Sequence, residues 1–142
     1  MFKKILVPVD LSTESTTKRL CEVANDMAQK YEASVELITV MPDYGMPIVA
    51  SFFPADAQKK LKQETLEKLQ NLAKTSFSVA VKTRLVIGEK RNRAILYEID
   101  QVAPDLVMIG CRRKKSFKSQ RLLGSTSTAI ANRAPCTVMV VR

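Results

Sequence analysis

The sequence contains no histidine and no tryptophan, and only 6% of its residues are aromatic. The absence of histidine excludes Ser-His-Asp catalysis, histidine-ligated zinc and imidazole acid–base chemistry. No apolar run approaches the ~20 residues of a membrane-spanning helix, so no membrane partner is expected. Because hydrophobic residues still make up 46% of the chain, we expect a continuous core of aliphatic side chains.

Cysteine is also scarce, because Cys21, Cys111 and Cys136 are too few and too scattered for a disulfide framework. Unpaired cysteines fit a reducing cytosol, and the first residues lead straight into a short strand without a secretory signal. We therefore expect a cytoplasmic protein. Cys21 and Cys136 stand in apolar patterns that are typical of a core. Cys111 precedes Arg112 and Arg113, whose charges would favour a reactive thiolate.

The chain has 142 residues, which predicts one domain over residues 1–142. Its formal net charge is +9 and its isoelectric point is about 9.7. This balance favours anionic partners, which include nucleotides, nucleic acid and acidic protein surfaces, and it does not choose among them.

Short apolar strands alternate with amphipathic helices along the whole chain. The predicted strands span residues 4–9, 34–40, 79–87, 105–109 and 136–141, and the predicted helices span 14–32, 55–75, 92–102 and 125–133. This alternation indicates an α/β fold, in which one parallel sheet has helices on both faces. Pro8 should fray the first strand because it cannot donate to the ladder, and Lys82 with Arg84 marks the third strand as an edge.

Two further segments have a distinctive composition. The second helix should bury a stripe of leucine and alanine, namely Leu61, Leu66, Leu69, Leu72 and Ala73. The preceding segment, 41–54, contains three prolines and one glycine and is therefore predicted to be a loop. Since Met46, Ile48, Phe52 and Phe53 make this loop apolar, it should fold over a sheet edge or touch a partner subunit.

The stretch from residue 105 to residue 127 combines a buried strand, a basic loop and the start of a helix. Gly110 ends the strand, and Ser125 or Thr126 could cap the helix, as Ser12 or Thr13 could cap the first helix. A helix N-terminus attracts anions through its free N–H groups and its dipole. The loop supplies six cations, which are Arg112, Arg113, Lys114, Lys115, Lys118 and Arg121. A phosphate-binding corner is one interpretation, and a solvated surface loop is the other.

Several segments resemble the universal stress protein family across the whole chain. They are KILVPVD at 4–10, LITV at 37–40, DLVMIG at 105–110, LLGSTS at 122–127 and APCTVMVVR at 134–142. The resemblance implies an adenine nucleotide alpha-hydrolase-like fold, with five parallel strands in the order 3-2-1-4-5. Many members bind ATP through a motif of Gly, two residues, Gly, nine residues, Gly and then Ser or Thr.

The match to that motif is partial. Gly110, Gly124 and Ser125 fit it, whereas Arg113 takes the place of the middle glycine, and the spacing to Gly124 is one residue longer. By resemblance, Asp10 would contact the ribose or a metal-linked polar network, although a helix cap is the alternative role for this residue. Val40 would offer backbone groups to adenine. The complete predicted nucleotide site is Pro8, Val9, Asp10, Val40, Gly110, Arg112, Arg113, Gly124, Ser125 and Thr126.

The leading functional hypothesis is a stress-response regulator that binds ATP, alone or with Mg²⁺, and acts on an unknown protein client. A nucleotide-free adaptor, a slow ATPase and nucleic-acid binding through residues 112–121 are the alternatives. The last is disfavoured because Phe117 is the only aromatic residue among these cations. No catalytic or metal-binding residue is predicted. The β-prone segment 136–141 should form an edge strand that pairs with a second copy in a homodimer.

Overall fold

The computed structural model describes residues 1–43, 51, 52, 54–111 and 123–142. These residues form one parallel sheet with the strand order β3-β2-β1-β4-β5, as predicted. In chain order the elements are β1 (Lys4–Val9), α1 (Glu14–Tyr31), β2 (Ser34–Met41), α3 (Ala55–Ser76), β3 (Val81–Ile87), α4 (Arg91–Val102), β4 (Leu106–Gly110), α5 (Ser125–Arg133) and β5 (Thr137–Val141).

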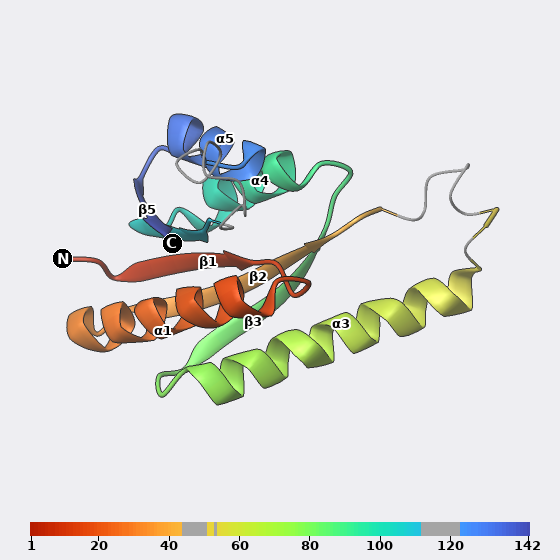
Figure 1. The fold of residues 1–142 in the computed structure, drawn as a ribbon, viewed down its shortest axis with the longest axis horizontal. Coiled ribbons are helices and arrows are strands. Elements are labelled where there is room, and N and C mark those ends of the chain that lie inside the picture. The colour runs from red at the N-terminus through yellow and green to blue at the C-terminus, as the bar shows by residue number, and fades with distance from the viewer. Residues whose placement is uncertain (44–50, 53, 112–122) are drawn as a thin grey trace.

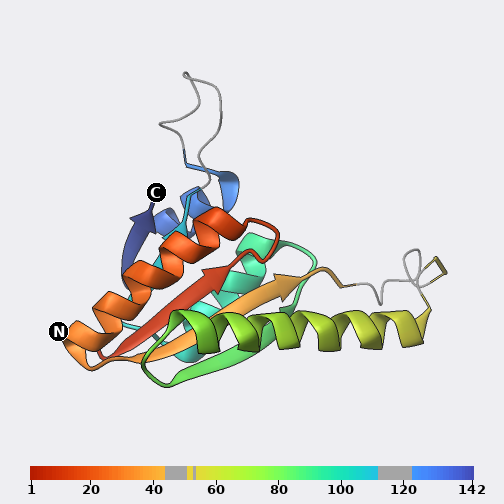
Figure 2. The same ribbon diagram turned by 60° about the horizontal axis from the view of Figure 1, so that its bottom comes forward.

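Helices cover both faces of the sheet, and each face has its own core (Figures 1 and 2). On one face, Leu20 of α1 and Leu69 of α3 pack with inward residues of the central strands, such as Val7. On the other face, Ile99 of α4 and Ile130 of α5 pack against the alternate strand residues. The central strands are therefore buried on both sides, which explains their continuous aliphatic sequences.

The register of β1 differs between its two neighbours. Along β2, β1 stays paired through Pro8 to Val9, which lies opposite Thr39. Along β4, the paired residues are Ile5 with Leu106 and Leu6 with Val107. The predicted fraying at Pro8 therefore occurs only on the β4 side. Proline has no N–H group to donate to a ladder, and on that side no strand is paired with it.

Several predicted boundaries shift by one or two residues. β3 begins at Val81 instead of residue 79, and β5 begins at Thr137, which leaves Cys136 half-buried instead of in the core. The predicted stripe of α3 is also only partly buried, because Leu69 and Ala73 are buried whereas its other leucines stay partly exposed. Figure 2 shows that the first turns of α3 extend beyond the carboxyl ends of the strands.

Candidate functional site

The strand order reverses between β1 and β4, and a cavity of about 370 Å³ lies at their carboxyl ends. After β1 the chain enters α1 on one face of the sheet, and after β4 it leads to α5 on the other face. The diverging connections leave a crevice, which is the usual ligand position in such sheets. The lining residues are Pro8, Val9, Asp10, Thr13, Thr16, Thr17, Leu20, Val40, Arg91, Ile95, Ile109, Gly110, Gly124, Ser125, Thr126, Ser127 and Ile130.

The cavity brings together the described part of the predicted site. All eight of its described residues line the wall: Pro8, Val9, Asp10, Val40, Gly110, Gly124, Ser125 and Thr126. Arg112 and Arg113, together with the rest of the basic loop through residue 121, lie outside the described residues. The structure therefore shows that residues from three strand ends and one helix start share a single cavity, while their contact with a ligand stays a prediction.

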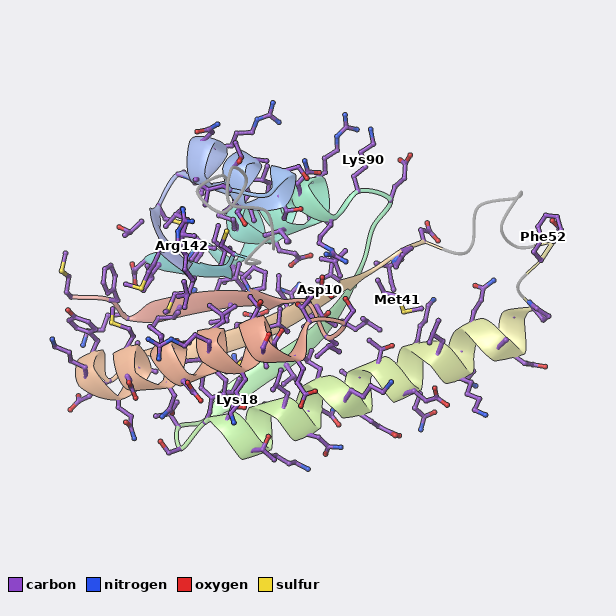
Figure 3. The ribbon with its side chains drawn as sticks, in the orientation of Figure 1. Asp10, Lys18, Met41, Phe52, Lys90 and Arg142 are labelled. Atoms are coloured by element: carbon purple, nitrogen blue, oxygen red, sulfur yellow. The ribbon has the colours of Figure 1, made fainter. Side chains whose placement is uncertain are left out.

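Asp10 organises the turn between β1 and α1 (Figure 3). Its Oδ1 accepts hydrogen bonds from the Ser12 N–H at 3.0 Å and the Ser12 hydroxyl at 2.6 Å. Its carbonyl oxygen accepts from the Thr13 N–H and from the Thr17 hydroxyl. The N-cap position of α1 is Thr13, whose side chain makes no capping hydrogen bond. Asp10 thus fixes the turn before the helix. The prediction that Ser12 or Thr13 stands at the N-cap is confirmed for Thr13, but its hydroxyl makes no capping hydrogen bond.

Arg91 is a site residue that the sequence analysis missed. It begins α4, and its Nη1 donates a hydrogen bond to Asp10 Oδ2 at 2.8 Å, which forms an ion pair across 81 positions of sequence. A cation at the start of an amphipathic helix is usually solvated, so no local pattern pointed to this contact. The ion pair places a positive charge in the wall of the cavity, beside the turn that Asp10 organises.

The two glycines of the site serve different purposes. A Cβ atom on Gly110 would lie 2.7 Å from Thr16 Cγ2, so α1 approaches the end of β4 too closely for any side chain there. Gly124 is the N-cap of α5, with φ −68° and ψ 163°, and a Cβ atom placed on it would have no described atom within 4 Å. The predicted cap by Ser125 or Thr126 is therefore wrong, because both residues lie inside the first turn.

The start of α5 suits an anion. Its first intrahelical hydrogen bond is donated by the Thr128 N–H to the Gly124 carbonyl, so the N–H groups of residues 125–127 have no acceptor within the helix. Such groups, with the helix dipole, stabilise negative charge. Among the described residues, no group of three or more histidine, cysteine, aspartate or glutamate side chains could hold a metal ion.

None of the three cysteines is joined in a disulfide in the described structure. Cys21 is fully buried, and burial, with a smaller contribution from Glu22, raises the pKa of its thiol to about 12. Cys111 is buried just after β4, where its N–H donates to the Val141 carbonyl at 2.8 Å. Arg112 and Arg113, the neighbours that could favour a reactive thiolate, lie outside the described part of the chain. No helix in that part is long and apolar enough to cross a membrane.

Fold and cavity together define a doubly wound α/β protein with a cavity at its switch point. The family model of the universal stress proteins matches residues 1–142, and the chain belongs to this family. A universal stress protein of Thermus aquaticus is 32% identical over 146 residues, with 100% of both chains covered. An uncharacterised protein of Schizosaccharomyces pombe is 36% identical over 92 residues, which is 61% of this chain and only 15% of that longer protein.

Solved structures share the fold. A universal stress protein in complex with cAMP has a TM-score of 0.69 at 21% identity, with 99% of this chain and 97% of that chain covered. The protein from Archaeoglobus fulgidus in complex with dAMP has a TM-score of 0.68 at 16% identity, with 99% and 98% covered. A family protein from Arabidopsis thaliana with AMP bound has a TM-score of 0.65 at 19% identity, with 98% and 90% covered.

Proposed function

We propose that this protein binds an adenine nucleotide in the switch-point cavity and acts by binding. The observation that carries the proposal is the cavity itself, which joins the ends of β1, β2 and β4 to the start of α5. Its volume of about 370 Å³ lies within the roughly 300–1,000 Å³ of small-molecule sites. The structural relatives that hold cAMP, dAMP and AMP support adenine as the base.

In the proposed arrangement, backbone groups of Val40 contact adenine, and Asp10 lies near the ribose. The phosphates lie at the start of α5, where Gly124, Ser125 and Thr126 line the wall. Pro8, Val9 and Gly110 complete the floor of the site. ATP, alone or with Mg²⁺, is the proposed ligand, and the expected setting is a cytoplasmic, homodimeric stress-response regulator with a protein client.

Titration calorimetry with ATP, AMP and adenosine tests this proposal on the wild type and on Gly124→Val. Valine would fill space that no described atom occupies, so it should weaken nucleotide binding about tenfold or more by steric exclusion while the fold persists. Thr128→Val is the matched control, because it places the same side chain at an exposed position of the same helix. Absence of heat with the wild type at ~0.1 mM protein, a concentration suited to weak sites, would reject the proposal.

A nucleotide-free adaptor is the second candidate, and it rests on one observation. Arg113 replaces the middle glycine of the family motif, and a glycine there would let backbone approach a phosphate closely. If the wild type binds no adenine nucleotide yet remains folded and dimeric, the adaptor hypothesis takes precedence. Native mass spectrometry of freshly purified protein distinguishes the two, because it detects a co-purified nucleotide and the oligomeric state together.

A further inference from the structure

The ion pair between Asp10 and Arg91 occupies the wall of the proposed nucleotide site. Its two side chains are 20% and 49% exposed, respectively, so solvent or a ligand can reach both groups. They come from different elements, since Asp10 follows β1 and Arg91 begins α4. Arg91 is not one of the positions of the glycine motif through which many family members bind ATP, so this cation is an addition to that motif.

Arg91 also lies between two hollows. Besides the main cavity, it lines an adjoining hollow of about 390 Å³, and Val40, Ser125 and Thr126 line both spaces as well. Arg91 thus stands in the same part of the wall as the first turn of α5, where the proposed site takes phosphate. A guanidinium group there is suited to hold phosphate oxygens through two parallel hydrogen bonds.

The guanidinium group of Arg91 already pairs with the carboxylate of Asp10 in the same chain. Asp10 Oδ2 accepts its hydrogen bond at 2.8 Å, while Ser12 holds Oδ1 of the same group. An anionic ligand must therefore compete with Asp10 for Arg91, whereas a neutral nucleoside has no need of that cation. A half-exposed ion pair stabilises a fold by only about 0–1 kcal/mol, so a phosphate group can displace Asp10 from Arg91.

We propose that Arg91 is the residue that selects phosphate-bearing ligands over neutral nucleosides, and that Asp10 competes with the ligand phosphate for it. This inference rests on the proposed nucleotide function. It adds the residue that makes the site selective for charged ligands. A purely structural ion pair is the competing explanation. It would tie α4 to the end of β1, and its loss would weaken adenosine and AMP binding to the same extent.

Calorimetry with adenosine and AMP on four variants separates these explanations. Arg91→Gln should weaken AMP binding about tenfold and adenosine binding less than about twofold, since one charged hydrogen-bond partner is lost. Asp10→Asn keeps an oxygen for Ser12 and should raise the ratio of AMP to adenosine affinity about threefold. Arg93→Gln is the control, because it removes the same charge from the same helix at an exposed position outside the cavity.

The double variant Asp10→Asn with Arg91→Gln provides the decisive comparison. If the two groups compete, the gain from Asp10→Asn disappears once Arg91 is absent. If that gain persists, Asp10 merely repels the phosphate through space, and the competition is refuted. Equal losses of adenosine and AMP in Arg91→Gln would overturn the selectivity. Failure of the proposed function looks different, because the wild type would then bind neither ligand.

Discussion

Gly110 and Thr16 meet where β4 ends against α1, and a Cβ atom on the glycine would lie 2.7 Å from Thr16 Cγ2. Gly110 does not have a positive φ, so this position requires glycine for space and not for backbone freedom. Gly88 has the same relationship to Ala94 at the start of α4, again at 2.7 Å. At the end of β4 and just after β3, a helix therefore lies too close for any side chain larger than that of glycine.

This packing predicts the effect of Gly110→Ala. The added methyl group should destabilise the fold by about 1–3 kcal/mol, as overpacking does in other cores. Thr16→Ser removes the atom that the methyl group would meet, so the double variant should recover most of the loss. Urea denaturation of the two single variants and the double variant measures this coupling. If the losses of unfolding free energy in the two single variants simply add in the double variant, the contact with Thr16 is not the cause of the destabilisation.

The order of strands and helices could be predicted because hydrophobic period and turn residues are local signals. Leu20 and Ala24 of α1 reveal its buried face through their spacing, and the apolar run before Gly110 reveals a strand buried on both faces. The family resemblance then supplied the strand order, which no local pattern contains.

The remaining errors arise from tertiary contacts. Arg91 was missed because its partner, Asp10, lies 81 positions away in sequence and joins it only when β1 and α4 are placed together. Hydroxyl residues favour the N-cap, which points to Ser125 or Thr126, but Gly124 takes the position. Leu66 follows the helical period yet stays only partly buried, because the period shows which face of a helix is apolar and not how much of that face the sheet covers.

A second prediction concerns Asp105, which joins the starts of β1 and β4. Its Oδ2 accepts hydrogen bonds from the Lys3 and Lys4 N–H groups, each at 2.8 Å, and these bonds lower the pKa of its carboxyl group from the usual 3.8. A lowered folded-state pKa means that this stabilisation is complete above pH ~4 and is lost as the pH falls through the folded value.

Asp105→Asn should therefore lower the thermal midpoint at pH 7, and the difference from the wild type should shrink below pH ~4. The decrease in the thermal midpoint should be modest because the Asp105 side chain is exposed. Asp100→Asn removes the same charge from an exposed position of α4 and serves as the control. Thermal unfolding monitored by circular dichroism between pH 3 and pH 7 checks the prediction. A difference that stays constant with pH would contradict it.

A third prediction concerns Arg84 on the edge strand β3. Its guanidinium hydrogen-bonds Glu36 Oε1 on β2, at 2.6 Å and 2.9 Å, and pairs with Glu98 on α4. Partial desolvation would lower the pKa of Arg84, but its bonds to Glu36 and Glu98 outweigh that effect and raise it. Arg84 is therefore a permanent cation that links β2, β3 and α4.

Arg84→Met should leave Glu98, whose side chain is only 8% exposed, without its cation. We expect a loss of about 2 kcal/mol, which is less than the roughly 3–5 kcal/mol for fully buried pairs because Arg84 is 40% exposed. Adding Glu98→Gln should restore part of the stability, since the buried charge is then removed. Urea denaturation of Arg84→Met, of Glu98→Gln and of the double variant measures this recovery, and no recovery in the double variant would refute this account.

The last prediction is the proposed homodimer through β5. Within the described residues, β5 pairs with β4 alone, so its outer edge presents backbone N–H and C=O groups. Met139 and Val141 pack with the core on the α1 side, and Val138 and Val140 pack with the core on the α4 side. The middle of the strand nevertheless remains only half-buried, and a two-fold mate would cover it.

The alternative is that residues 41–54 cover this edge. Most of that segment lies outside the described residues, but Figure 3 places Phe52 beside the start of α3, well apart from Arg142 at the end of β5. Phe52 is 85% exposed and therefore does not cover the strand. This placement favours a second copy of the chain as the cover for the outer edge.

Sedimentation equilibrium at micromolar concentration should give twice the 15.9 kDa chain mass for the wild type. Val140→Lys should shift the protein toward monomer, because a charge on an edge strand opposes pairing with another strand. Val81→Lys places the same charge at a half-buried position of the opposite edge strand and should leave the dimer intact. Circular dichroism must show both variants folded, and a wild type that sediments as a 15.9 kDa monomer would eliminate the β5 dimer.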